Sequence, residues 1–104
     1  MLKKIETREA ISFKVYDAMK AVKAMLKEKE ALTEEWENKV YSAEAEVITC
    51  EDLIFFYDTP DMNAKLAKAY NRLRHYQYIY HKLVNECEEL EQALIGLEKA
   101  DYWL

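Results

Sequence analysis

The stretch Asp58-Thr59-Pro60-Asp61 decides the fold, because it holds the only proline of a 104-residue chain that has a single glycine. Threonine is a good N-cap, proline suits the first position of a helix, and an acidic residue suits the positive end of a helix. One helix is therefore predicted to end just before this stretch, and another to begin at Pro60. Such a short connection is typical of neighbouring antiparallel helices.

Working back from the turn, residues 8–58 contain neither glycine nor proline, and apolar residues recur at alternating spacings of four and three. This spacing keeps one stripe of a helix facing a partner helix, and we call that stripe the seam. The predicted seam consists of Ile11, Val15, Ala18, Val22, Met25, Lys29, Leu32, Trp36, Val40, Ala43, Val47, Cys50, Ile54 and Tyr57. Two successive four-residue steps from Leu32 to Val40 predict a stutter, which is a local unwinding of the supercoil.

Forward from the turn, the same spacing continues without a break. The second seam consists of Met62, Leu66, Ala69, Leu73, Tyr76, Tyr80, Leu83, Cys87, Leu90, Leu94 and Leu97. The two seams predict an all-α fold, a long antiparallel helical hairpin resembling a coiled coil. We place the first helix at about residues 7–57, the turn at 58–60 and the second helix at about 60–100, all within one helical domain, 1–104.

A second architecture is a compact three-helix bundle in which the first helix breaks near Thr33. Threonine followed by Glu34 and Glu35 resembles a helix start, with an N-cap and acidic residues in the first turn. Against a break, residues 27–40 are rich in strong helix formers and contain no glycine or proline.

The formal charges fall into four alternating blocks that mirror each other about Pro60. Residues 1–29 carry eight bases and four acids, and residues 30–61 carry one base and ten acids. Residues 62–85 carry five bases and no acid, and residues 86–104 carry one base and six acids. Folding back at the turn sets each acidic block beside a basic one, and this complementarity favours a single antiparallel register.

Apolar residues make up 51% of the chain, which is more than the two seams can bury. Tyr41, Ile48 and Phe55 recur every seven residues and form a second stripe on the first helix, here called the outer stripe. A two-helix hairpin cannot bury a second face, so we expect another molecule to cover it. A homodimer that forms a four-helix bundle is the simplest cover.

These features predict a non-enzymatic interaction module that binds or occludes a partner protein. The candidate partner-binding residues combine the acidic block with the outer stripe: Glu34, Glu35, Glu37, Tyr41, Glu44, Ile48, Glu51, Asp52, Phe55 and Phe56. An alternative function follows from the acidic excess of residues 30–61. Carboxylates in such numbers can imitate phosphates, so the chain could be a small inhibitor from a phage or another mobile element. Its target would be a nucleic-acid-binding enzyme such as a defence nuclease.

A third hypothesis concerns residues 65–82, where bases alternate with tyrosines as in nucleic-acid-binding segments. Lys65, Lys68, Arg72 and Arg74 would contact phosphates in that case. The simpler interpretation is that Tyr76 and Tyr80 belong to the seam and the bases face the acidic block. Nucleic acid is therefore not the expected partner.

Motifs that carry chemistry are not found in the sequence. It contains no glycine-rich phosphate loop, nucleophile elbow or zinc-ligand spacing, so no catalytic, cofactor-binding or metal-binding residue is predicted. Cys50 and Cys87 fall on the seams and are expected to be buried free thiols in a reducing compartment. No signal-peptide core or membrane-spanning run occurs, so we expect a cytoplasmic protein without a membrane segment.

Overall fold

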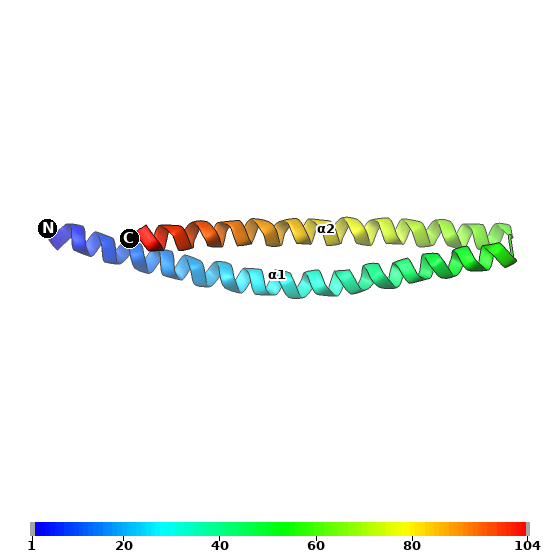
Figure 1. The fold of residues 1–104 in the computed structure, drawn as a ribbon, viewed down its shortest axis with the longest axis horizontal. Coiled ribbons are helices and arrows are strands. Elements are labelled where there is room, and N and C mark those ends of the chain that lie inside the picture. Colours follow the sequence, from blue (N-terminus) through cyan, green and yellow to red (C-terminus); the bar gives the residue numbers. More distant parts are fainter. Residues whose placement is uncertain (1, 104) are drawn as a thin grey trace. The chain divides into compact units, whose positions relative to one another are not determined.

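The computed structural model describes the backbone of residues 2–103 and the side chains of residues 10–103. It contains helix α1 (Leu2–Phe56) and helix α2 (Pro60–Trp103), which pack as a hairpin (Figure 1). The predicted all-α helical hairpin is therefore confirmed. Both helices extend a few residues beyond the predicted bounds at the open end, because no helix-breaking residue follows or precedes the predicted limits there.

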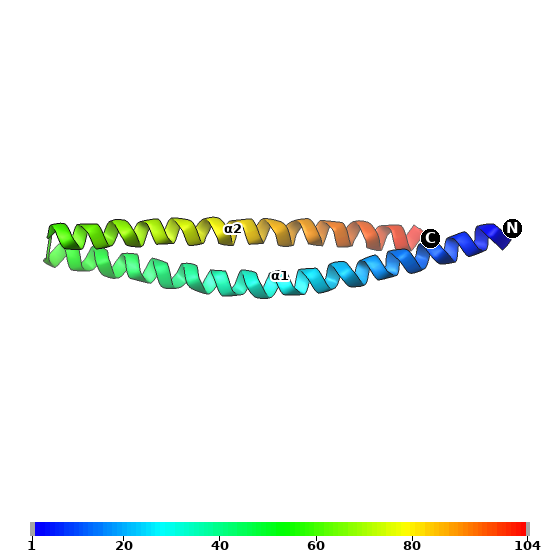
Figure 2. The same cartoon turned by 180° about the vertical axis from the view of Figure 1, so that it is seen from behind.

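The turn has the predicted capping chemistry. The Thr59 hydroxyl accepts a hydrogen bond from the backbone N–H of Met62 at 3.2 Å, as an N-cap side chain does. Pro60 occupies the first helical position, and the Asn63 side-chain amide donates to the Asp58 carboxylate at 2.7 Å. Both helices meet at this turn, which can be followed from either side of the molecule (Figures 1 and 2).

Helix α1 passes through Thr33 without interruption, so the three-helix alternative is wrong. Thr33 is half-buried, and it lies three residues before the half-buried Trp36 on the same side of the helix. A helix-forming sequence and the packing of this side thus outweigh the local capping signal at Thr33.

The contacts divide the hairpin into two units. Unit 1 combines Met1–Glu30 with Asn85–Leu104, and unit 2 is Ala31–Val84. Each unit contains a segment of α1 and a segment of α2. That the two units fold as one domain remains a prediction.

The core is confined to the predicted seams. The buried residues of the described part of the chain are Val40, Ala43, Val47, Ala69, Leu83 and Cys87. Ala43 is 3% exposed and Ala69 is 1% exposed, so the tightest packing occurs where the side chains are smallest. Cys50 is half-buried, and both cysteines are free thiols, as the sequence predicted.

The predicted stutter is wrong, because the seam of α1 follows a different set of residues before Trp36. Met25 is 51% exposed and Leu32 is 39% exposed, although both were placed in the seam. Met19, Leu26 and Thr33 are half-buried instead, and together with the predicted seam residues Val22 and Lys29 they continue the four-three spacing backward from Trp36 without a break. An unbroken repeat needs no local unwinding of the helix, and it places Thr33 rather than Leu32 in the seam.

One ion pair in each unit joins an acidic block to a basic block. In unit 1 the Lys29 ammonium contacts the Glu86 carboxylate, and both side chains are about one-third exposed. In unit 2 the Arg72 guanidinium contacts Glu46 at 2.5 Å. The predicted pairing of the charge blocks is therefore confirmed.

We expect the double variant Lys29→Leu/Glu86→Leu to raise the free energy of unfolding by about 1 kcal/mol. Removing both charges avoids their partial desolvation and adds apolar contacts in the seam. Urea denaturation followed by circular dichroism measures the change. The single variant Lys29→Leu, which leaves Glu86 without its lysine, should be less stable than the double variant. A double variant less stable than the unmodified protein would contradict this expectation.

Candidate partner-binding surface

The outer stripe lies on unit 2 and is open to solvent. Tyr41 and Ile48 are each 58% exposed, and Phe55 is 84% exposed. Their seven-residue spacing places them on one side of α1, almost exactly two helical turns apart. Large apolar side chains that are exposed in line, rather than singly, are typical of interaction surfaces.

An acidic edge runs beside the outer stripe, between it and the seam. It consists of Glu37, Glu44 and Glu51, which are also seven residues apart. Glu37 precedes Tyr41 by one helical turn, and the Tyr41 hydroxyl donates a hydrogen bond to its carboxylate at 2.9 Å. Apolar and acidic groups therefore alternate along this side of α1.

Helix α2 lies beside the acidic edge, on the side away from the outer stripe. The Tyr70 hydroxyl donates a hydrogen bond to the Glu51 carboxylate across the seam. Gln77 and Val84 follow Tyr70 at seven-residue spacing. The exposed Arg74 lies one turn after Tyr70, and the exposed His81 lies one turn after Gln77. We call this set, Tyr70, Arg74, Gln77, His81 and Val84, the α2 flank.

The two tyrosines on this surface remain neutral hydrogen-bond donors. The hydrogen bond to Glu37 raises the pKa of Tyr41 above its ordinary value near 10, and the Glu37 charge adds to the shift. The hydrogen bond to Glu51 raises the pKa of Tyr70, while the nearby Arg74 charge partly opposes the shift. Because the folded-state pKa values are raised, these hydrogen bonds hold at neutral pH and weaken only as the pH rises above 10.

Seven of the ten candidate residues share this surface. They are the outer stripe, the acidic edge, and Glu34, which precedes Tyr41 by seven residues. Glu35 and Phe56 lie on the opposite side of α1, where Ser42 and Thr49 also lie. Glu35 precedes Ser42 by seven residues, and Phe56 follows Thr49 by seven. Asp52 lies between the two sides. The structure thus places the acidic block around the helix rather than on one face.

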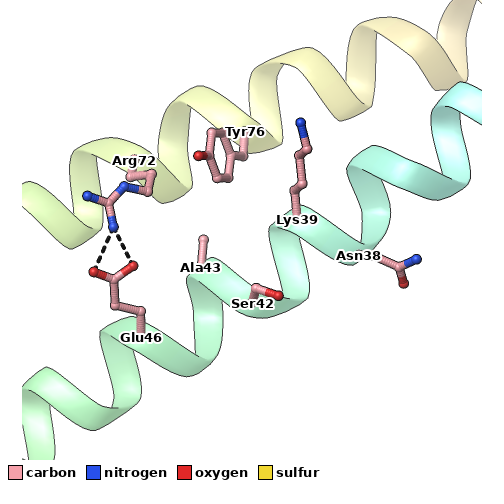
Figure 3. Close-up of a pocket in the computed structure, with 7 residues that line it drawn as sticks. All are labelled: Asn38, Lys39, Ser42, Ala43, Glu46, Arg72 and Tyr76. Atoms are coloured by element: carbon pink, nitrogen blue, oxygen red, sulfur yellow. Dashed lines mark hydrogen bonds and ion pairs between the residues drawn. The ribbon is translucent and has the colours of Figure 1, made fainter.

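The opposite side of unit 2 carries a cluster that the sequence reasoning missed. An open pocket there is lined by Asn38, Lys39, Ser42, Ala43, Glu46, Arg72 and Tyr76 (Figure 3). One Arg72 nitrogen donates to both oxygens of Glu46, at 2.7 and 2.5 Å, and this contact closes one end of the pocket. The pair joins the acidic block of residues 30–61 to the basic segment of residues 62–85 across the seam, so its charges were the signal that could have revealed it.

Trp36 organises the other end of the same cluster. Its ring packs edge-on against Tyr76, with the ring centroids 5.5 Å apart. The Lys39 ammonium lies 4.1 Å from the centroid of the Trp36 ring, at the distance of a cation–π contact. The aromatic and charged groups here satisfy one another, which makes this side a structural cluster rather than a binding site.

The basic segment of α2 is only partly available for binding. Tyr76 and Tyr80 are half-buried in the seam, and Arg72 is paired with Glu46. The exposed remainder consists of Lys65, Lys68, Arg74, His75, Tyr78, His81 and Lys82. Two tyrosines and one arginine that a nucleic-acid site would use are thus engaged within the hairpin, whereas most of the aromatic and basic groups of this segment are exposed.

Unit 1 carries exposed aromatic residues on both of its helix segments. Phe13 is 70% exposed, Tyr16 is 55% exposed and Trp103 is 83% exposed. Phe13 and Tyr16 line an open pocket with Ser12 and Asp101. No metal-binding group of three histidine, cysteine or acidic side chains occurs among the described residues.

Comparison with known proteins found no family model that matches this chain, and no curated protein or solved structure that matches it significantly. The class that the fold itself defines is the antiparallel helical hairpin. Within residues 2–103, neither helix has an apolar stretch long enough to cross a membrane.

Proposed function

We propose that this protein is a non-enzymatic interaction module that binds a partner protein through the outer stripe and the acidic edge of α1. The observation that carries the proposal is the exposure of Tyr41, Ile48 and Phe55 in a row, with Phe55 84% exposed. Exposed aromatic and aliphatic side chains surrounded by polar groups are the usual anchors of protein interfaces. A cytoplasmic location suits the two free thiols, Cys50 and Cys87.

A photo-crosslinking amino acid at position 48 tests this surface. We expect light to join it to a protein that mass spectrometry can identify, because Ile48 lies at the centre of the outer stripe. The matched control carries the same crosslinker at position 42, since Ser42 lines the pocket on the opposite side of α1. Equal yields from positions 42 and 48, or no product from position 48, would refute binding through the outer stripe.

Charge mimicry of nucleic acid is a second candidate function, and unpaired carboxylates favour it. Within the described residues, no ion pair joins Glu34, Glu35, Glu44 or Asp52 to a base, whereas Glu46 is neutralised by Arg72. In this function the chain occupies the basic groove of a nucleic-acid-binding enzyme, as an inhibitor from a phage or another mobile element would. Charge reversal of Glu34, Glu35 and Glu37 should then abolish binding to that enzyme, and binding with an unchanged salt dependence would refute mimicry.

A further inference from the structure

We propose that the partner of the outer stripe is a second copy of this chain, with both turns at the same end and α1 of each copy lying over α2 of the other. This proposal rests on the proposed function, because it names the occupant of the same surface. The charges of unit 2, the exposure of the outer stripe and the observed register carry it.

The surface to be covered extends over both helices of unit 2. Helix α1 contributes the outer stripe and the acidic edge, and α2 contributes the α2 flank, in which Arg74 and His81 are exposed. The contact between Glu51 and Tyr70 shows that the two contributions meet on one side of the hairpin. This side is therefore acidic and apolar along α1, whereas along α2 it carries the base Arg74, the Tyr70 ring and no acid.

Two arrangements place these surfaces face to face about a two-fold axis. With the turns at opposite ends, α1 lies over α1 of the second copy, and the acidic edges oppose each other. With the turns at the same end, α1 lies over α2 of the second copy. The α2 flank carries Arg74 and no acid, so only the second arrangement sets opposite charges against each other.

The register of this arrangement follows from contacts within one chain. In this arrangement the two-fold axis runs parallel to the helices, so it does not change the height of a residue along them. An α1 residue therefore lies level with the same α2 residue in the second copy as in its own chain. Glu46 lies level with Arg72, as their ion pair shows. Counting two residues along each helix, Glu44 lies level with Arg74 of the second copy, and Ile48 lies level with its Tyr70.

The resulting interface has the composition of a stable one. Ile48 and Tyr41 would be covered by aromatic and aliphatic groups of the α2 flank, and the Glu44 carboxylate would meet the Arg74 guanidinium at two symmetric sites. Tyr41 and Phe55 lie about 21 Å apart along the helix at the usual rise of 1.5 Å per residue. The second copy thus covers three apolar anchors in line, as in a four-helix bundle.

Sedimentation equilibrium of the full chain provides the first measurement. The 12.4 kDa chain is expected to sediment at twice its mass, and Ile48→Glu is expected to weaken the dimer by about a hundredfold or more, since it places a charge at the centre of the interface. Circular dichroism should show an unchanged helix content, because Ile48 is exposed within one chain.

A charge swap tests the arrangement itself. Glu44→Lys and Arg74→Glu should each weaken the dimer by about tenfold or more, because each sets like charges together at two sites. Mixing the two variants should restore association, since one site then joins Lys to Glu and the other joins Glu to Arg. In the arrangement with opposed turns, Glu44→Lys sets a lysine against the acidic edge of the second copy, so this variant alone would strengthen the dimer rather than weaken it. The control Glu35→Lys makes the same charge change on the opposite side of α1 and should leave the dimer unchanged.

Each of the remaining outcomes would refute one defined part of the proposal. A chain that stays monomeric at a concentration of about 100 μM refutes the second copy, whereas crosslinking of another protein from position 48 would still uphold the proposed function. A dimer that withstands Ile48→Glu refutes the outer stripe as the interface. A dimer that Ile48→Glu disrupts but the mixed variants do not restore refutes the arrangement with the turns at the same end.

Discussion

The variant Ala69→Asp is expected to lower the free energy of unfolding by about 3–5 kcal/mol, enough to unfold a marginal hairpin. Ala69 is 1% exposed and is the most tightly enclosed residue of the described core. Aspartate adds volume at an enclosed position of the seam, and it places an unpaired charge away from water. Urea denaturation monitored by circular dichroism at 222 nm measures the loss.

The matched control for this variant is Ala45→Asp. Ala45 is an exposed alanine of the same unit, so its substitution changes charge and helix propensity without entering the seam. We expect it to cost only a few tenths of a kcal/mol to about 1 kcal/mol. Equal destabilisation by the two aspartates would show that the seam at Ala69 is not the centre of the core.

The second large effect is expected for Trp36→Ala, which should cost about 2–4 kcal/mol. The substitution removes the edge-on contact with Tyr76 at 5.5 Å and the surface on which the Lys39 ammonium rests. It also leaves a cavity beside the buried Val40, where the seam of α1 enters its most enclosed part.

The chain offers a control of the same residue type at position 103. Trp103 is 83% exposed, so Trp103→Ala should change the free energy of unfolding by less than about 0.5 kcal/mol. Thermal unfolding of the two variants, measured side by side, gives the comparison. A Trp36→Ala variant as stable as Trp103→Ala would mean that the cluster around Trp36 contributes little to the fold.

The sequence was sufficient to predict the hairpin because its turn signal is unambiguous. Pro60 and the Thr59 cap occur once, and glycine and proline are otherwise nearly absent from a strongly periodic chain. Charge blocks of opposite sign then predicted which segments would lie together, and the pairs Lys29–Glu86 and Glu46–Arg72 confirm it. These signals depend only on residue type and on spacing along the chain, so the sequence contains them in full.

The seam before Trp36 could not be predicted in the same way. Leu32 is more apolar than Thr33, so a rule based on hydrophobicity alone selected Leu32, and between the two apolar neighbours Met25 and Leu26 such a rule could not decide. In the structure the helix keeps an unbroken four-three repeat, so Leu26 and Thr33 occupy the seam while Met25 is 51% exposed and Leu32 is 39% exposed. The geometry of a continuous helix pair outweighs the burial of two side chains, because a stutter would disturb packing on both sides of it.

The candidate surface likewise has features that the sequence determined and features that only the tertiary structure decided. The sequence by itself determined the helices, the turn, the pairing of charge blocks and the outer stripe of Tyr41, Ile48 and Phe55, because each depends on composition and spacing along one helix. Only the tertiary structure decided that Glu51 meets Tyr70, that Arg72 is held by Glu46, and that seven of ten candidate residues share one surface. Those contacts depend on the register of α1 against α2 and on side chains reaching across the seam, and neither can be read from one helix alone.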